Sequence, residues 1–327
     1  MALKAFSDKN VYFDVNIHND TTQYKVASFT ENRTVNILEK GSDYTMTIVR
    51  LFIPGSSIPI FVFTNSPHPF IIGIKKGANP IVNQQLIYDN TWNPTAIPAG
   101  AIWSYSQLCA IINTALTAIT PIVNAQPPAT LHDPPFIWFD TKTGTFKIRF
   151  ANATHATDFT IYMNSALFDL FLTFPAKIVS FYSSTGNDVQ LILDQNNPNN
   201  QVGTAFDLSQ EVQTQYAPSG LRRVFLKSTL LNTRPEKQFQ NEGLNISESI
   251  LTDFEPASGG HDFRMNALIQ YVPLGEFRRI DIINSNPVTN IDLKFYWQDK
   301  WGQIYEVLLP PNQFISIKLL FEKKLKF

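Results

Sequence analysis

The clearest alternation of apolar and polar positions in this chain lies between residues 268 and 321. Because successive side chains of a strand point to opposite faces, residues 291–298 are expected to form a strand with one apolar face. That face carries Ile291, Leu293, Phe295 and Trp297, and the other carries Asp292, Lys294 and Tyr296. Similar patterns, separated by tight turns, predict strands at 275–285, 303–309 and 314–321. Together they predict a local antiparallel sheet of four strands.

Short strand patterns bounded by Pro, Gly and Asn continue along the rest of the chain. They are predicted at 11–17, 44–53, 59–64, 70–74, 84–88, 136–140, 145–150, 159–163, 177–182, 189–193, 206–212, 222–231, 246–254 and 265–271. Roughly eight short strands fall on each side of residue 200, about the number that two jelly rolls need. The sequence therefore predicts an all-β protein built as a jelly-roll β-sandwich, with two jelly rolls in tandem or one jelly roll with a large insertion.

One segment, residues 104–119, has helical instead of strand periodicity. Its apolar positions are Leu108, Ile111, Ile112, Ala115, Leu116 and Ile119. Ser104 can cap the first turn, with Gln107 three positions later, and Pro121 follows the expected end. We expect one helix here and a short helical turn at 165–172, before Pro175.

The Asn-rich stretch at residues 195–203 is the best candidate for a domain boundary, because it is polar and has no hydrophobic period. On this basis we expect an N-terminal arm at 1–10, a first jelly-roll domain at 11–194 with a helical and loop insertion, a linker at 195–203 and a second jelly-roll domain at 204–327.

Composition favours a protein that associates with other subunits. Of 327 residues, 44% are hydrophobic and 13% aromatic, but only 16% are charged, well below the usual quarter. Apolar surface beyond what one core absorbs usually marks contacts with partners. A net charge of -1 argues against extensive coating of nucleic acid. The single cysteine, Cys109, is expected to be a buried thiol, and no apolar run approaches the length of a membrane span.

No catalytic or cofactor motif is visible in the sequence. Phosphate-binding loops, dinucleotide-binding loops, zinc-protease helices and nucleophile elbows are all missing. The five histidines are scattered, and none lies within four residues of another. His132-Asp133 and His261-Asp262 are the only neighbouring histidine–carboxylate pairs, and we interpret both as solvated loop residues. We therefore expect no enzyme activity, metal or cofactor.

Two other groups of side chains have alternative functional interpretations. Asp253 and Glu255 could form the acid–base pair of a glycosidase, but the Pro- and Gly-containing stretch that follows favours a turn. The C-terminal lysines Lys323, Lys324 and Lys326 could contact packaged nucleic acid weakly, or they could guard the edge of a sheet.

An aromatic cluster near the C-terminal end allows a further alternative. Phe295 and Trp297 are expected in the core, whereas Tyr296 and Trp301 could be exposed and could stack on sugars or at a subunit interface. A carbohydrate-binding β-sandwich that serves as an attachment protein is therefore an alternative function.

Three segments resemble the C-terminal part of jelly-roll capsid proteins, of the penton or minor capsid type, from virophages and polinton-like DNA viruses. They read Gln270-Tyr-Val-Pro-Leu-Gly-Glu-Phe-Arg-Arg279, Ile291-Asp-Leu-Lys-Phe-Tyr-Trp-Gln-Asp-Lys-Trp-Gly302 and Phe314-Ile-Ser-Ile-Lys-Leu-Leu-Phe-Glu-Lys-Lys324. The segment 164–175 is similar to the same group more weakly. These segments determine packing, so the resemblance assigns no functional residue individually.

The resemblance implies a structural virion protein, a penton or minor capsid subunit of an icosahedral shell with extended subunit interfaces. The implied partners are copies of the chain, as a pentamer or a trimer, together with other capsid proteins. Assembly is expected in the cytoplasm or nucleus of the host cell, and residues 1–10 are expected to reach a neighbouring subunit. A compact double-jelly-roll major capsid protein, which would form trimers, is the alternative within the same class.

Overall fold

The structure, a computed structural model, describes most of the chain. The described residues are 10–89, 100–182, 187–194, 200–212, 221–233, 240–241, 244–245, 249–254, 268–271 and 279–324. The chain forms two compact units, one of Met1–Ile58 with Leu221–Phe327 and the other of Pro59–Gly220. This division differs from the expected boundary at 195–203, because the first and last strands of the chain pair with each other and enclose the second unit in the sequence.

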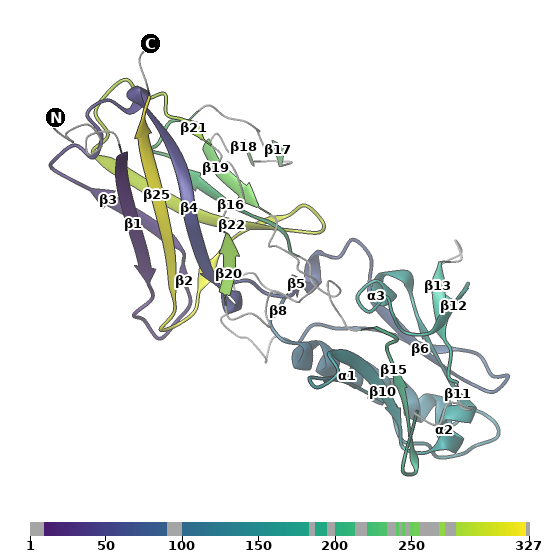
Figure 1. Ribbon diagram of the computed structural model, residues 1–327. Coiled ribbons are helices and arrows are strands. Elements are labelled where there is room, and N and C mark those ends of the chain that lie inside the picture. The colour runs from purple at the N-terminus through teal and green to yellow at the C-terminus, as the bar shows by residue number, and fades with distance from the viewer. Residues whose placement is uncertain are drawn as a thin grey trace. The chain divides into compact units, whose positions relative to one another are not determined.

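The first unit contains a sheet built from both ends of the chain (Figure 1). Its order is β1 (Asn10–His18), β25 (Phe314–Lys323), β4 (Tyr44–Pro54) and β20 (Leu268–Tyr271), with β21 (Ile280–Asp281) also paired to β4. All pairings are antiparallel, and β1 and β25 pair along their whole length, from Asn10 opposite Glu322 to His18 opposite Phe314.

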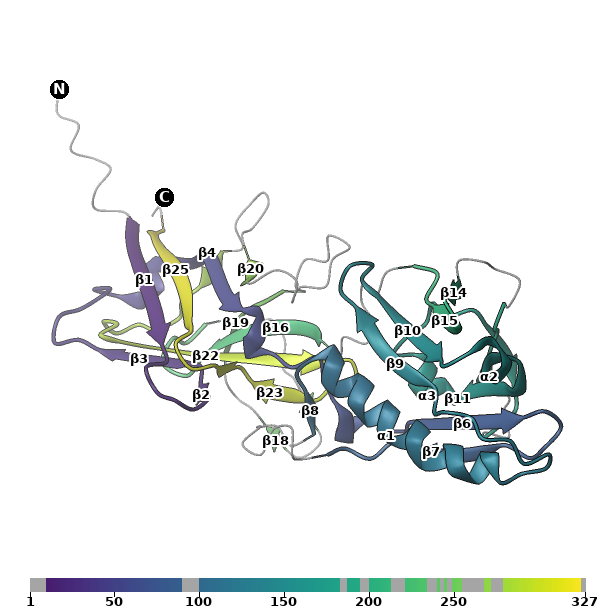
Figure 2. The same cartoon turned by 90° about the horizontal axis from the view of Figure 1, so that it is seen from below.

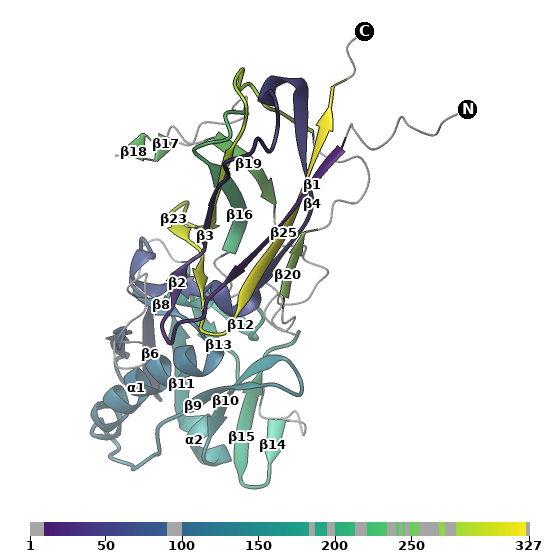
Figure 3. The ribbon, with the colours of Figure 1, turned by 90° about the vertical axis from the view of Figure 1, so that its left-hand side faces the viewer.

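A second antiparallel sheet faces the first one in this unit, as Figure 3 shows. Its central strands are β22 (Asn290–Asp299) and β16 (Leu221–Ser228). β19 (Ser249–Phe254) pairs with β16, while β3 (Ser28–Asn32) and β23 (Ile304–Glu306) pair with opposite halves of β22. Two short ribbons complete the described strands of the unit: β2 (Lys25–Val26) with β24 (Leu308–Leu309), and β17 (Gln240–Asn241) with β18 (Leu244–Asn245).

The order of the strands identifies this unit as a jelly roll. Its eight principal strands, in chain order, are β1, β3, β4, β16, β19, β20, β22 and β25. One sheet has the order first, eighth, third and sixth, and the other has the order second, seventh, fourth and fifth. This is the double Greek-key arrangement of a jelly roll. The second unit is therefore an insertion between the third strand, β4, and the fourth, β16.

The core of the jelly roll follows the predicted alternation. In β22 the predicted face is confirmed, since Ile291, Leu293, Phe295 and Trp297 are at most 1% exposed. The opposite sheet contributes Phe13, Val15, Ile17, Ile315, Ile317 and Leu319. The predicted four-stranded meander is wrong, however, because β22 and β25 belong to different sheets. The chain passes from one sheet to the other between β23 and β25, by way of β24 in a separate ribbon.

The inserted unit also has two sheets, but they are connected differently. One has the order β12 (Ala176–Val179), β13 (Asp188–Leu191), β11 (Phe159–Met163), β6 (Ile71–Lys76) and β7 (Val82–Gln85). The other has the order β14 (Gln201–Val202), β15 (Ala205–Ser209), β10 (Thr145–Phe150) and β9 (Phe136–Asp140). β5 (Phe61–Val62) pairs with β8 (Ala101–Ile102), and α2 (Ala153–Asp158) and α3 (Ser165–Phe168) are short helices. The all-β prediction is confirmed, but the tandem pair of jelly rolls is wrong, and one jelly roll with a large insertion is the arrangement observed.

The long helix α1 (Tyr105–Asn124) packs against β6, β7 and β9 of the inserted unit (Figure 2). Ser104 caps it as predicted, because its hydroxyl accepts the Gln107 N–H at 3.1 Å. The helix continues past its expected end and includes Pro121. By length and composition α1 alone among the described helices could cross a membrane, but more than half of its most apolar window is buried within the protein, as in an ordinary core helix.

Candidate functional site

The C-terminal lysines lie at the end of β25. Lys323 is exposed, whereas the Lys324 ammonium lies 2.9 Å from the Asp281 carboxylate and its backbone N–H donates to the Asp43 carbonyl. Lys326 lies outside the described residues. One of the two described lysines is therefore already engaged by a carboxylate of the same unit.

Tyr296 and Trp301, the predicted exposed aromatics, have different surroundings. The Tyr296 ring stacks on Phe225 with centroids 5.6 Å apart, and the Lys227 ammonium lies 4.7 Å from its centroid. Trp301 sits in the turn after β22, where the buried Asp299 carboxylate accepts its backbone N–H at 2.9 Å. Burial raises the pKa of Asp299, although several hydrogen bonds oppose this effect. Both aromatic side chains are only partly exposed.

The residues considered for an acid–base pair do not form one among the described positions. Asp253 lies 3.3 Å from Arg223 of the neighbouring strand, which is an ion pair across β16 and β19. Glu255 and the His261-Asp262 pair lie outside the described residues. No group of three metal-ligating side chains occurs in the part of the chain that the structure describes. Cys109 is buried as expected, and burial raises the pKa of its thiol to about 12.

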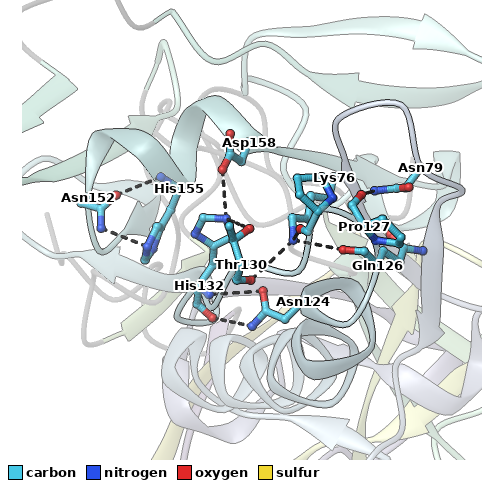
Figure 4. A network of polar contacts seen from close by, with 11 residues as sticks. Lys76, Asn79, Asn124, Gln126, Pro127, Thr130, His132, Asn152, His155 and Asp158 are labelled. Carbon is cyan, nitrogen blue, oxygen red and sulfur yellow. Dashed lines mark hydrogen bonds and ion pairs between the residues drawn. The ribbon is translucent and has the colours of Figure 1, made fainter.

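A network of polar contacts occupies the inserted unit, around the segment that follows α1 (Figure 4). His132, interpreted from the sequence as solvated, is buried, and its Nε2 lies 3.0 Å from Asp158 at the end of α2. Its backbone is held by Asn124, whose side chain both accepts its N–H and donates to its carbonyl. The carboxylate partner of His132 is thus Asp158, which is 26 positions away in the sequence, and the interpretation of His132 as a solvated loop residue is wrong.

His155 of α2 packs edge-on against His132, with ring centroids 4.3 Å apart. The Nδ1 atoms of both rings are buried and have no hydrogen-bond partner among the described residues. Burial and the neighbouring His132 lower the pKa of His155, although Asp133 and Asp158 act in the opposite direction. The neutral form of the His155 imidazole is therefore favoured here.

Lys76 of β6 anchors the other end of the same segment, as Figure 4 shows. Its ammonium is buried and donates to the backbone carbonyls of Gln126, Pro128 and Thr130, the shortest bond being 2.7 Å to Pro128. A buried ammonium that finds only carbonyl acceptors ties a loop to a strand. The network thus fixes residues 124–132 against β6 and α2, and its geometry suits a structural role.

A group of aromatic and charged side chains covers the outer side of the first sheet of the jelly roll. We call it the β1–β25–β4 face, and it consists of Tyr12, Asp14, Arg50, Phe52, Phe314 and Lys318. Asp14 lies between two cations, 3.7 Å from Arg50 and 3.4 Å from Lys318. Lys318 also lies over the Tyr12 ring at 5.1 Å, and Arg50 lies over Phe52 at 5.8 Å.

This face could not be recognised in the sequence. Its signal was present in the positions that alternate with the core, since Tyr12 and Asp14 alternate with Phe13 and Val15. The missing information was the pairing of β1 with β25 and of β25 with β4, which brings these positions together from opposite ends of the chain.

Comparisons with known proteins agree with this architecture. Residues 11–98 and 99–323 match the family model described as Sputnik minor capsid protein V18/19. Structural protein V19 of Sputnik virophage is 30% identical over 185 residues, which cover 52% of this chain and 84% of that protein.

Two solved structures have a similar fold. A chain in the 3.5 Å cryo-EM structure of the Sputnik virophage matches with a TM-score of 0.78 and 24% identity, covering 97% of this chain and 98% of that one. The mavirus penton protein matches with a TM-score of 0.70 and 15% identity, covering 97% of this chain and 100% of that one. Both matches span the jelly roll and the insertion. On these grounds the chain belongs to the Sputnik minor capsid protein V18/19 family, and it is a structural protein of the virion capsid that assembles with other capsid proteins.

Proposed function

We propose that this protein is a penton subunit, five copies of which form each vertex of an icosahedral shell. The observation that carries the proposal is the likeness to the mavirus penton protein along the whole of that chain, including the unit inserted between β4 and β16. The trimeric major capsid alternative would need a second jelly roll, and the sheets of the inserted unit have a different strand order.

The β1–β25–β4 face is the surface proposed to contact the next copy in the ring. Interfaces are enriched in aromatic residues and Arg, and this face offers Tyr12, Phe314 and Arg50. Tyr12 is 58% exposed, although it lies within β1. Burying such a ring at an interface contributes binding free energy. The ion pairs of Asp14 beside it would fix the relative orientation of the two subunits.

The two ends of the chain have proposed secondary roles. β1 begins and β25 ends at the same end of the sheet, where Asn10 pairs with Glu322. An N-terminal arm before Asn10 would reach a neighbouring subunit from this end, and Lys323, Lys324 and Lys326 would contact packaged nucleic acid weakly there. Assembly in the host cytoplasm or nucleus remains part of the same proposal.

Native mass spectrometry and negative-stain electron microscopy of the purified full chain test the penton proposal. The expected result is a ring of five copies with fivefold symmetry. A trimer would contradict the proposal in favour of a major capsid role, and a monomer at micromolar concentration would contradict it altogether.

The proposed interface is tested separately by charge reversal. Arg50→Glu places a second acidic group beside Asp14, so the ring is expected to dissociate at least tenfold more readily while the thermal midpoint of the monomer changes little. The matched control is Lys177→Glu, an exposed reversal on the inserted unit, which should leave the ring intact. Equal effects of the two variants would place the interface elsewhere.

A further inference from the structure

The outer face of the four-stranded sheet in the inserted unit carries a second group of aromatic and charged side chains. We call it the β9–β10–β15 face, and it consists of Phe136, Trp138, Asp140, Lys147, Arg149 and Asp207. The residues that alternate with them, among them Ile137, Ile148 and Leu208, are buried in the unit. Phe136 is 52% exposed, and Trp138 and Arg149 are partly exposed.

The aromatic rings on this face are held in one orientation. The rings of Phe136 and Trp138 are inclined by only 20°, with centroids 6.3 Å apart. The Arg149 guanidinium lies 4.8 Å from the Trp138 centroid, and two hydrogen bonds of 2.7 Å fix it to Asp207. The strands and these contacts already hold the rings in place. Little side-chain entropy is therefore lost when a ligand stacks on them.

Several hydrogen-bond donors beside the rings remain available. The bonds to Asp207 use Nε and Nη2 of Arg149, which leaves Nη1. Lys147 gives one of its three protons to Asp140 at 2.6 Å. The Trp138 indole N–H has no acceptor among the described residues. The face therefore combines ring surfaces with donors that suit hydroxyl groups.

The charges and the edge of the sheet limit which ligand this face can take. Its two cations are each paired with a carboxylate, Lys147 with Asp140 and Arg149 with Asp207, so the net charge of the six residues is zero. Polyanions need clustered unpaired positive charge, which this face does not offer. Strand addition at β9 is blocked, because the side chain of Asn113 in α1 occupies both backbone groups of Ile137.

We propose that the β9–β10–β15 face binds a neutral glycan. Pyranose C–H groups would stack on Phe136 and Trp138, and hydroxyl oxygens would accept from Arg149, Lys147 and the Trp138 indole N–H. This inference goes beyond the proposed penton role and gives the inserted unit a task of its own, recognition of a carbohydrate surface. It also moves the carbohydrate-binding role considered for Tyr296 and Trp301 to a different pair of aromatic residues.

A glycan array that contains neutral, sialylated and sulfated glycans tests the proposal with the assembled full-length protein. Saturation-transfer NMR with each array hit then identifies contacts in solution. The expected result is binding of one or more neutral glycans. Binding of only charged glycans, or of none, would overturn the proposal whether or not the protein is a pentamer.

Three variants localise the binding. Trp138→Ala should weaken it at least tenfold, and Phe136→Ser should do the same without disturbing the fold, because Phe136 is the more exposed ring. Trp301→Ala is the matched tryptophan control in the jelly roll and should bind as the wild type does. Loss of binding in Trp301→Ala but not in Phe136→Ser would overturn the assignment. So would protection of Trp138 from oxidation in the assembled ring, since a protein partner would then occupy the face.

Discussion

In both the jelly roll and the inserted unit, buried and exposed side chains alternate along the strands. The two units differ in which strands of the chain pair with each other. The jelly roll joins β1 to β25, two strands separated by almost the whole chain, and so needs both ends of the sequence. The described strands of the inserted unit pair only among themselves, within residues 59–220, around helix α1. We therefore expect that a substitution that unfolds one unit leaves the other unit largely folded.

The largest effect is expected from Ile317→Asp in β25. Ile317 is fully buried between Val15 of β1 and Leu51 of β4. An unpaired carboxylate there should cost more than about 4 kcal/mol and unfold the jelly roll. Hydrogen-exchange mass spectrometry should show lost protection in β1, β4 and β25.

The same measurement tests whether the two units are independent. Peptides from β10 and β11 should remain protected in Ile317→Asp, because their partners all lie in the inserted unit. Asn16→Asp, an exposed change on β1, is the control and should leave both units protected. Simultaneous loss of protection in both units would disprove the independence drawn from the comparison.

The next effect concerns Asp292, a buried carboxylate of the jelly roll. Asp292 of β22 accepts hydrogen bonds from the Ser228 and Thr229 hydroxyls and from the backbone N–H groups of Thr229 and Leu230. Asp292→Ala leaves these donors without their acceptor, and we expect a loss of about 2–4 kcal/mol in the free energy of unfolding. Urea denaturation of the jelly roll measures it.

The loss of unfolding free energy in Asp292→Ala is also expected to depend on pH. Burial raises the pKa of Asp292, but the hydrogen bonds outweigh burial and lower it overall. A carboxyl whose pKa is lowered on folding stabilises the protein above its unfolded pKa, and this stabilisation is lost as the pH falls through the folded pKa. The difference between wild type and Asp292→Ala should therefore narrow below about pH 4. A constant difference down to pH 2 would contradict this account.

Much of the fold could be predicted from the sequence, because alternation and helical period are local. The strands at 136–140, 145–150 and 159–163 have the predicted bounds, and Ser104 caps the predicted helix. Strand partners could not be predicted in this way. Alternation in β22 and β25 indicates which side chains face a core, but not that the two strands belong to different sheets.

The candidate surfaces were harder to predict for the same reason. Tyr12 and Lys318 are some 300 positions apart in the sequence, and only the register of β1 and β25 brings them together. Likewise His132 stands next to Asp133 in the sequence, but the fold gives it Asp158. A histidine in a Pro-rich connector carries no local sign that a later helix will cover it.

In the inserted unit, Lys76→Met tests a buried charged group, as Asp292→Ala does in the jelly roll. The ammonium of Lys76 is buried and holds the carbonyls of residues 126–130, whereas methionine fills the space but donates no hydrogen bond. The expected loss is about 1–3 kcal/mol in the unfolding of the inserted unit, with no change in the jelly roll. Limited proteolysis should cut the variant first between residues 126 and 132.

A control variant separates the effect of the Lys76 hydrogen bonds from that of its packing. Lys75→Met alters a more exposed neighbour on the same strand and serves as the control. Equal stability of the two variants would mean that the carbonyl contacts of Lys76 contribute nothing beyond packing of its side chain.

The smallest effect is a pH dependence that should belong to the inserted unit alone. Because burial and His132 lower the pKa of His155 on folding, the unfolded chain binds a proton more readily than the folded one as the pH falls below about 6.5. Stability is therefore full above that pH and decreases on acidification, and His155→Gln should remove a few degrees of this decrease. Thermal unfolding between pH 7.5 and 5.5 measures it, with His68→Gln, an exposed histidine of the same unit, as the control. If wild type and His155→Gln lose stability in parallel across that range, the protonation of His155 is not linked to folding and only the packing of its ring matters.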